Sequence, residues 1–409
     1  MLVAVDDAAV AAAAAELDAS LVELRREIHR WPERSGEERR TAELVAERLE
    51  AAGLAVATGI GGHGVVAVLN GAGDGPTVAY RADMDALDRP EALDLPETFV
   101  SDFASRVPGV AHLCGHDLHT AIGVGIAQVL ARFRDRLPGR VGFFFQPAEE
   151  TLTGARAMIE ADALEQVAPR EIYALHCGPL PVGRFAVMPG FGLPGQDRFR
   201  ITLAGPTAAA DAGRLAGRIE ALTTVQLTRD REQTQRLLAS LERPGGPLAR
   251  FVVIAATVES DRRGARIAGW VRAWPDERYP EIRVRLRYLA DSVGARIAFP
   301  DPPFPAMVCS PELSQALAAH LRDTLGPDAV TVLHGSYPTH SEDFARFLRE
   351  VPGAMCYLGV ADAAAGIHGV PHSPDFAADE RAVGVGVRGM ASFLASRLAA
   401  PPADPSAGR

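Results

Sequence analysis

The chain has 409 residues, 47% hydrophobic and 23% charged, a composition that predicts a globular protein of about two domains with an ample core. Its net charge of −10 argues against nucleic acid or an anionic membrane as partner, because attraction to phosphate requires a basic surface. All 42 basic residues are arginine, which excludes the lysine-dependent chemistry of Schiff bases and P-loops.

The composition also predicts a cytoplasmic location. Residues 1–20 are acidic and rich in alanine and lack a basic region, so no signal peptide is expected. The longest apolar runs fall short of the roughly 20 residues that cross a bilayer. The cysteines show no paired spacing that would predict a disulfide framework; they are Cys114, Cys177, Cys309 and Cys356.

The first half of the chain alternates between predicted helices and strands. Apolar residues at helical spacing predict helices over 7–53, broken near Trp31-Pro32. The elements predicted after them are strands over 63–70 and 77–83, a helix over 121–133, a strand over 140–145, a helix over 153–164 and a strand over 171–175. This alternation predicts an α/β fold with a mostly parallel sheet, where functional groups gather at the carboxyl ends of strands. Such ends are predicted at Asp83, Glu149, Glu150 and His176.

The pattern changes near residue 193. Alternating strands are predicted over 198–204, 251–258 and 265–270, with helices over 208–228 and 277–293. A small antiparallel sheet beside two helices indicates an inserted α+β domain. The predicted organisation is a catalytic domain over 1–192 and 303–409, interrupted by a domain over 193–302. The last predicted elements of the catalytic domain are helices over 311–325, 342–350 and 379–398 and a strand over 354–358.

The segment 112–120 gathers three histidines, a cysteine and an aspartate within nine residues. Cys114 and His116 would point to different sides of a helix, so we expect them to converge from a loop that Asp117 or Thr120 caps where the next helix begins. A soft thiolate beside imidazoles suits zinc better than calcium or magnesium. The alternative interpretation is that these are capping and core residues.

Taken together, the motifs resemble the M20 metallopeptidase family, in its aminoacylase/amidohydrolase branch, which includes hippurate hydrolases and auxin-conjugate hydrolases. The resemblance runs from about Leu24 to Leu398. The segments that carry it are Arg25-Arg26, His29, Pro32-Glu33, Arg81-Ala82-Asp83-Met84-Asp85, Cys114-Gly115-His116-Asp117, His119-Thr120, Gln146-Pro147-Ala148-Glu149-Glu150, Leu175-His176, Gly269, Arg272, Ser341-Glu342-Asp343-Phe344, Pro352-Gly353-Ala354 and His372-Ser373-Pro374.

The resemblance implies a zinc-peptidase-like catalytic domain and an inserted lid or dimerisation domain, through which a homodimer would form. It also implies a pair of divalent metal ions, Zn²⁺ or Mn²⁺ first, with Ni²⁺ and Co²⁺ as alternatives. The implied metal ligands are Cys114, His116, Glu150, His176 and His372. Glu149 would be the general base for a metal-bound water and Asp83 a group beside the ligands, while His119 would orient a neighbour by a hydrogen bond.

One part of the family pattern is missing. Most relatives carry a histidine on the inserted domain, whereas the matching segment here is 204–210, and no histidine occurs between His176 and His320. An oxyanion would then need another donor, for which the candidates are the metal ions, Arg272 and His340. The simpler interpretation is that His340 caps a helix beginning near Ser341.

Three functions are compatible with these residues. The first is hydrolysis of the amide bond of an N-acyl amino acid or a related small conjugate. The second is a biosynthetic tailoring enzyme on the same scaffold, with an unusual substrate or a non-hydrolytic step. The third is a non-catalytic metal or ligand binder, against which Glu149 argues, because a binder needs no general base.

Overall fold

The computed structural model describes residues 5–88, 102–227, 231–261, 264–299 and 302–400. The chain divides into two compact units. The first unit comprises Met1–Val187, Glu312–Thr331 and Phe347–Arg409, and the second comprises Met188–Pro311 and Val332–Arg346. The domain borders at 193 and 302 stay predictions.

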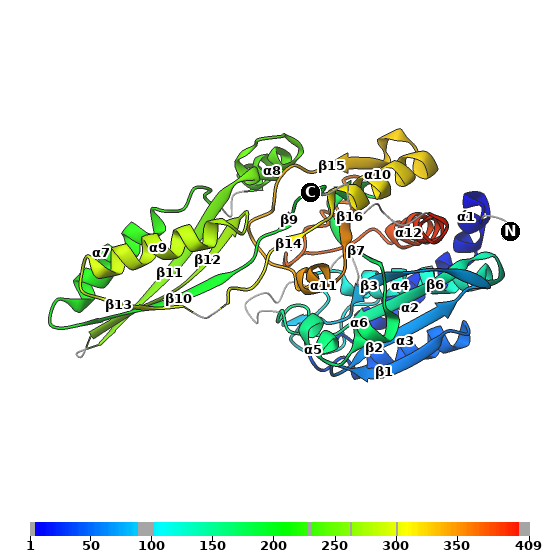
Figure 1. The fold of residues 1–409 in the computed structure, drawn as a ribbon, viewed down its shortest axis with the longest axis horizontal. Coiled ribbons are helices and arrows are strands. Elements are labelled where there is room, and N and C mark those ends of the chain that lie inside the picture. The colour runs from blue at the N-terminus through cyan, green and yellow to red at the C-terminus, as the bar shows by residue number, and fades with distance from the viewer. Residues whose placement is uncertain (1–4, 89–101, 228–230, 262–263, 300–301, 401–409) are drawn as a thin grey trace. The chain divides into compact units, whose positions relative to one another are not determined.

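The first unit contains an eight-stranded sheet of order β1-β2-β6-β3-β7-β16-β8-β15 (Figure 1). Its strands are β1 Ala55–Ile60, β2 Gly64–Asn70, β3 Gly73–Asp83, β6 Pro138–Gln146, β7 Glu171–Pro181, β8 Phe185–Val187, β15 Val330–Val332 and β16 Gly353–Ala361. The central strands β6, β3, β7 and β16 pair in parallel, while β1 pairs antiparallel with β2, β2 with β6, and β8 with β16. The predicted α/β class with a mostly parallel sheet is confirmed. Strands β4 Leu87–Asp88 and β5 Val110–Ala111 form a separate pair.

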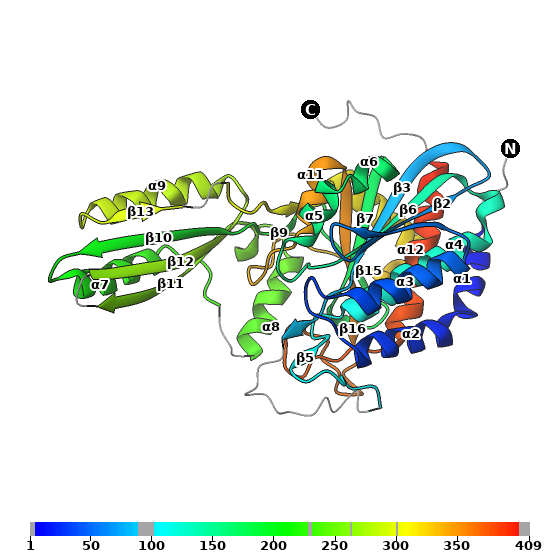
Figure 2. The same cartoon turned by 90° about the horizontal axis from the view of Figure 1, so that it is seen from below.

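Helices cover both faces of this sheet. They are α1 Asp7–Ala15, α2 Asp18–Arg30, α3 Arg39–Ala51, α4 His116–Arg132, α5 Gly154–Glu160, α6 Ala163–Val167, α10 Pro311–Leu325, α11 Phe344–Glu350 and α12 Arg381–Ala399. Figure 2 shows α1, α2, α3, α4 and α12 beside one another.

Strand β6 shows how the two faces are filled. Phe145 lies against Gly123 of α4, whereas the neighbouring Phe144 packs on Phe347 of α11 with ring centroids 5.6 Å apart. Successive side chains of a strand point to opposite faces, so α4 and α11 lie on different sides of the sheet. All three phenylalanines from 143 to 145 are buried, as the apolar run predicts.

The second unit has its own core. A four-stranded antiparallel sheet of order β11-β12-β10-β13 is built from β10 Asp197–Ala204, β11 Phe251–Asp261, β12 Gly264–Trp274 and β13 Arg296–Ala298. Strand β10 alternates strictly between buried and exposed residues, and its buried face packs with α7 Ala208–Glu220 and α9 Arg278–Asp291. A two-stranded sheet, β9 Gly192–Leu193 with β14 Met307–Val308, completes the described strands.

The helix predicted over 208–228 is shorter than expected, because α7 ends at Glu220 and residue 228 lies outside the described residues. The next threonines bind a neighbouring strand instead: Thr223 Oγ1 accepts the N–H of Ile254, and Thr224 Oγ1 accepts that of Val252. Such side-chain bonds to the backbone compete with helix formation.

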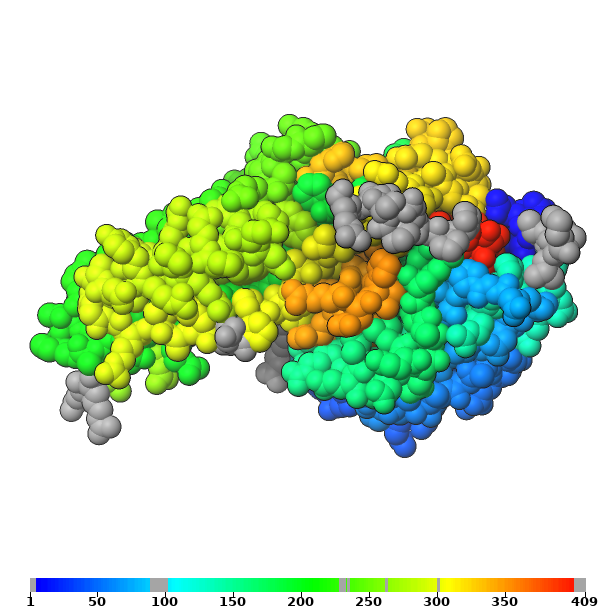
Figure 3. Space-filling model, viewed as in Figure 1, coloured from blue at the N-terminus to red at the C-terminus, as the bar shows by residue number. Residues whose placement is uncertain are grey.

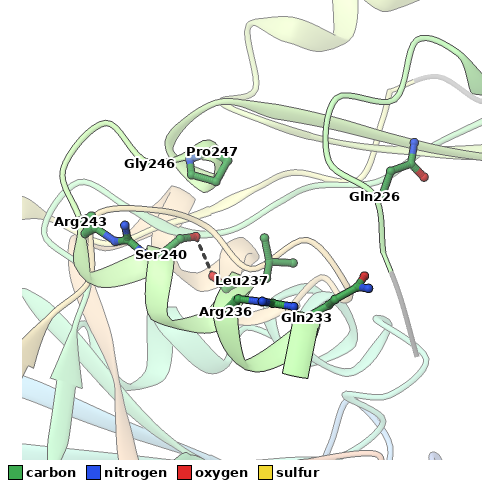
Figure 4. A pocket seen from close by; sticks show the side chains of 8 residues that line it. All are labelled: Gln226, Gln233, Arg236, Leu237, Ser240, Arg243, Gly246 and Pro247. Carbon is green, nitrogen blue, oxygen red and sulfur yellow. Dashed lines mark hydrogen bonds between the residues drawn. The ribbon is translucent and has the colours of Figure 1, made fainter. Parts of the chain in front are cut away.

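Helix α8 Arg231–Ala239 was not predicted. It borders a pocket of about 430 Å³, where the hydroxyl of Ser240 donates to the carbonyl of Leu237 (Figure 4). The pocket is lined by Gln226, Gln233, Arg236, Leu237, Ser240, Arg243, Gly246 and Pro247.

Two other sequence-based expectations can be compared with the structure. No described helix is long and apolar enough to cross a membrane. All four cysteines are buried and none forms a disulfide.

Helix α9 exposes Val284 and Tyr288, which are 62% and 72% accessible, and Figure 3 shows this helix at the surface.

Candidate metal centre

The turn before α4 depends on one glycine. Gly115 has φ of 83°, in the left-handed region, and a β-carbon there would lie 2.5 Å from Cys177 Sγ. Only glycine meets both conditions without strain. The turn leaves Cys114 just before the helix and makes His116 its first residue.

The predicted cap by Asp117 or Thr120 is therefore wrong, whereas Cys114 lies in a loop just before the helix, as expected. Helix α4 begins at His116 rather than 121, and Asp117 and Thr120 lie inside it. Both side chains are used for tertiary contacts. Asp117 pairs with Arg25 (Nε to Oδ2, 2.7 Å) and with His29 (Nδ1 to Oδ2, 2.8 Å), and Thr120 Oγ1 donates to the carbonyl of Asp83 at 2.8 Å.

The thiol of Cys114 lies between two imidazoles that are distant in the sequence. Its Sγ is 3.4 Å from His176 Nε2 and 3.2 Å from His372 Nε2. His176 lies inside β7 rather than at its end, because the strand continues to Pro181. His176 can still contact the cluster, because the pairing of β7 with β3 ends at Ala174, two residues earlier.

Glu150 closes the other side of the cluster. Its Oε1 lies 3.3 Å from His372 Nε2 and 3.8 Å from His116 Nε2, and Glu149 Oε2 is 3.9 Å from the same His116 nitrogen. All five predicted ligands thus belong to overlapping groups whose donor atoms lie within 4.8 Å of one another. The structure brings them together from a loop, a helix start, a strand and two further loops.

Two of these donor atoms fit a cation. His116 Nε2 and Glu150 Oε1 are buried and have no hydrogen-bond partner among the described residues. Leaving a buried polar atom unsatisfied costs roughly 1–3 kcal/mol, so such atoms call for a partner. A set of one thiolate, three imidazoles and a carboxylate suits a borderline transition metal.

Neighbouring groups orient the imidazoles. His116 Nδ1 lies 3.1 Å from Asp85 Oδ1, and His176 Nδ1 donates to the carbonyl of Cys177 at 2.7 Å. Each contact fixes the ring with Nε2 facing the cluster, as outer groups do at metal sites. Asp85 was missed as a functional residue, although it lies two positions after Asp83 and so on the same side of an extended segment.

Asp83 and His119 form a second layer beneath the cluster. Asp83 Oδ1 lies 2.7 Å from His119 Nδ1, and its Oδ2 accepts from Arg81 at 2.6 Å. His119 Nε2 accepts the N–H of Cys177 at 2.8 Å. Both ring nitrogens of His119 are therefore engaged in these contacts. That His119 orients a neighbour rather than binding metal stays a prediction.

The electrostatics of the site follow from burial and the nearby carboxylates. Burial lowers the pKa of His116, but Asp83, Asp85 and Glu150 outweigh burial and raise it to about 10. Burial, with the nearby Glu150 carboxylate and other groups, raises the pKa of the Cys114 thiol well above its usual value. A divalent cation would reverse this effect, because a coordinating thiol loses its proton.

Two backbone positions at the site are strained. His372 has φ of 62° and Ala148 has φ of 54°, both in the left-handed region that non-glycine residues rarely adopt. The backbone of His372 is held by its N–H, which donates to the carbonyl of Leu113 at 2.7 Å. Such strain persists where the surroundings impose it, often at functional sites.

The remaining histidine of the 112–120 segment does not join the cluster. His112 is buried with its ring 6.1 Å from that of His29, and burial lowers its pKa to about 3. His29 and Asp117 belong to the same structural layer. Residues of the 112–120 segment therefore belong to two groups, the cluster and the contacts around His29. Within α4 this is possible because successive residues of a helix point to different sides.

Arg272 and His340 both belong to the second unit. The Arg272 guanidinium donates to the carbonyl of Thr339 and, at 3.0 Å, to Gln196 Oε1, and it stacks over Trp270. His340 Nδ1 lies 2.8 Å from Thr339 Oγ1. Helix α11 begins at Phe344, whose N–H donates to Glu342 Oε1, so the interpretation of His340 as its cap is wrong.

Comparisons with known proteins identify the family of this chain. The model of the peptidase family M20/M25/M40 matches residues 79–396. The chain is 31% identical to the N-acetylcysteine deacetylase of Bacillus subtilis over 380 residues (89% of this chain, 93% of the relative). It is also 31% identical to an IAA-amino acid hydrolase of Arabidopsis thaliana over 395 residues (92% and 86%).

A solved structure is similar over nearly the whole chain. It is a dinuclear metal-binding peptidase of the M20 family from Bacillus subtilis, with a TM-score of 0.75 and 27% identity, covering 94% of this chain and 99% of the other. The resemblance expected from the motifs is thereby confirmed. The chain belongs to the peptidase family M20/M25/M40 and is a metal-dependent amidohydrolase of the M20 type.

Proposed function

We propose that this protein hydrolyses the amide bond of an N-acyl amino acid or a related small conjugate. The observation that carries the proposal is the cluster of Cys114, His116, Glu150, His176 and His372, with Glu149 beside it. Cys114, His116 and His176 are buried, whereas Glu150 is partly buried and His372 is exposed. The names of the relatives support the substrate class, because one removes an acetyl group from N-acetylcysteine and another acts on IAA-amino acids.

The five clustered residues would hold two divalent ions, Zn²⁺ or Mn²⁺. Bound ions would polarise the scissile carbonyl and lower the pKa of the attacking water. Asp85 and the Cys177 carbonyl would keep His116 and His176 turned toward the ions, through the contacts at their Nδ1 atoms.

Glu149 would act as the general base. Its carboxylate is buried and lies beside the proposed ligands without being needed to complete their set. It would accept a proton from the attacking water and deliver it to the nitrogen of the leaving amine. One water is consumed, the carbonyl–nitrogen bond breaks, and a carboxylic acid and an amine are released.

Arg272 is the proposed group for an anionic part of the substrate. No carboxylate among the described residues pairs with its guanidinium, and burial lowers its pKa. His340 is the alternative donor, since it and His334 are the histidines that the sequence places in the second unit. The proposed role of Arg272 rests on the family resemblance. That of His340 rests on its position directly before the Ser341-Glu342-Asp343 turn, which is expected near the substrate pocket.

A second candidate function has one observation in its favour. The turn between β10 and α7, where relatives carry a histidine, reads Gly205-Pro206-Thr207 here. A changed lid favours an unusual substrate or a tailoring reaction on the same metal centre. The two functions differ in their products, so one assay separates them.

The test is a panel of N-acyl amino acids with the purified protein, before and after removal of metal by a chelator. We expect release of the free amino acid, loss of release on chelation and recovery with Zn²⁺ or Mn²⁺. A protein that binds metal but releases no amine from any member of the panel would favour the tailoring reaction.

The inserted domain is proposed to form a homodimer through α9. Val284 and Tyr288 lie one helical turn apart, and both are largely exposed. Replacing both with glutamate should shift the protein to a monomer in size-exclusion chromatography with light scattering. If the wild type is itself a monomer at micromolar concentration, the homodimer is ruled out.

A further inference from the structure

One fully buried carboxylate of the first unit has no part in the cluster. Glu38 lies just before α3 and is 0% exposed. Its Oε1 accepts two backbone hydrogen bonds, from the N–H of Gly36 at 2.7 Å and from that of Ala148 at 2.8 Å. Gly36 is a local neighbour, whereas Ala148 lies 110 residues away in the chain.

Ala148 is the residue that sets the direction of the two glutamates after it. Its φ of 54° is left-handed, a conformation that is unfavourable for a residue with a β-carbon. Its carbonyl accepts the N–H groups of Thr153 and Gly154, so the segment closes into a tight turn. An extended or helical residue at 148 would send Glu149 and Glu150 in other directions.

A second carboxylate holds the same turn from the other side of Glu149. Asp85 Oδ2 accepts the N–H of Glu150 at 3.0 Å and the hydroxyl of Ser35 at 2.6 Å, while its Oδ1 contacts His116. The peptide N–H groups at 148 and 150 are therefore both held by buried carboxylates. Both carboxylates also accept a hydrogen bond from the segment before α3: Asp85 from the hydroxyl of Ser35, and Glu38 from the N–H of Gly36.

We propose that Glu38 is a positioning residue, which keeps Ala148 in its left-handed conformation and thereby places Glu150 in the metal cluster and Glu149 beside it. The inference rests on the proposed function, because it uses the roles assigned there to these two glutamates. It adds a residue that contacts neither metal nor substrate.

The role requires an acceptor atom rather than a negative charge. Burial raises the pKa of Glu38 to about 7, against the effect of its backbone donors, with Asp85 adding to the rise. Near neutral pH the side chain is thus partly protonated while its hydrogen-bond acceptor remains. Glutamine offers the same acceptor, so Glu38→Gln should bind metal within about threefold of wild type.

The main experiment measures Zn²⁺ affinity by competition with a chromophoric chelator. Glu38→Ala should bind Zn²⁺ about 10–100-fold more weakly, the usual cost of losing a group that orients a ligand. Adding Ala148→Gly should restore most of the affinity, because glycine adopts the left-handed conformation without the acceptor. A residue with only a general effect on stability would not be rescued by this second change.

Glu33 provides a matched control in the same segment. Its carboxylate accepts the N–H groups of Arg40 and Thr41, and its contacts are with α3 rather than with the 148–150 turn. Glu33→Ala should lower the melting temperature and leave Zn²⁺ affinity within about threefold of wild type.

The outcomes are decisive without a substrate. Zn²⁺ affinity of Glu38→Ala within about threefold of wild type, or no recovery in the double variant, overturns the proposal. Should Glu38→Ala fail to fold, Glu38→Gln and the double variant carry the test, and a tenfold loss in either overturns it. A wild type that hydrolyses no N-acyl amino acid would refute the proposed function and leave this affinity test standing.

Discussion

The adjacent residues Glu149 and Glu150 are proposed to have different roles, and a strained turn precedes them. Glu149 and Glu150 follow the left-handed Ala148, and the N–H groups on both sides of Glu149 are held by Glu38 and Asp85. Glu150 Oε1 lies 3.3 Å from His372 Nε2, and Glu149 Oε2 lies 3.9 Å from His116 Nε2. The assignment of base and ligand can therefore be separated by mutation.

Glu149→Gln should keep its metal and lose about 10²–10⁴-fold in kcat, the usual contribution of a positioned acid–base group. Glu150→Gln should first lose metal affinity, because it removes a proposed ligand. Metal content by elemental analysis and kcat at saturating metal distinguish the two. Turnover near that of wild type in Glu149→Gln would refute the mechanism.

The thiol assignment is tested at Cys114. Cys114→Ala should lower metal content and affinity, since it removes the atom that lies between His176 and His372. Cys356→Ala is the control, because that buried thiol contacts the carbonyl of Ala174 and the sulfur of Met390 instead. Equal metal binding by wild type and Cys114→Ala would show that the thiolate is not a ligand.

Among the elements, α4 is the one whose first turn makes contacts with several different parts of the site. His116, in its first turn, belongs to the cluster and contacts Asp85. His119 contacts Asp83, and Asp117 forms an ion pair with Arg25. The start of the helix is therefore fixed by tertiary contacts and by the space at Gly115. Helix α7 offers the contrast, since Gly213 and Gly217 have open space around them.

The glycines inside α7 and the glycine just before α4 should respond oppositely to replacement by alanine. Gly213→Ala and Gly217→Ala should each stabilise the protein by about 1 kcal/mol, because alanine has the higher helix propensity and both positions are exposed. Gly115→Ala should lower both the melting temperature and Zn²⁺ affinity, since its β-carbon would displace Cys177. Thermal unfolding with and without metal measures both effects. An unchanged Zn²⁺ affinity in Gly115→Ala would show that the turn does not set the cluster.

On the scale of the whole molecule, the proposed ligands and the proposed substrate groups belong to different units of the chain. The ligands are in the first unit, and Arg272 and His340 are in the second, where Thr339 contacts both side chains. Whether the second unit takes part in the reaction is then a question of kinetics.

Arg272→Ala should lower kcat/KM by about 10²-fold, measured well below its melting temperature, if its guanidinium binds substrate or oxyanion. His340→Ala should have a smaller effect of the same kind. Arg283→Ala is the control, because that arginine pairs with Asp197 at 2.7 Å and should matter for stability alone. If Arg272→Ala and His340→Ala both leave kcat/KM unchanged, the metal ions alone stabilise the oxyanion.

The sequence by itself determined the fold class, the family and most of the candidate ligands. Apolar periodicity and the order of short motifs are local properties, so they located the parallel strands, α10 at 311–325 and the residues of the cluster. Chemistry limited to thiol, imidazole and carboxylate side chains also indicated a transition metal before any geometry was known.

Tertiary structure decided which of these side chains meet and what holds them. Asp117 and Thr120 are good caps by sequence, yet they bind Arg25, His29 and the carbonyl of Asp83, which only the folded chain brings near. Asp85 and Glu38 carry no local signal for their contacts with Glu150 and Ala148, 65 and 110 residues away. Such contacts depend on strand pairing and burial. A carboxylate in water is hydrogen-bonded to solvent, so it needs these backbone donors only after folding has excluded water.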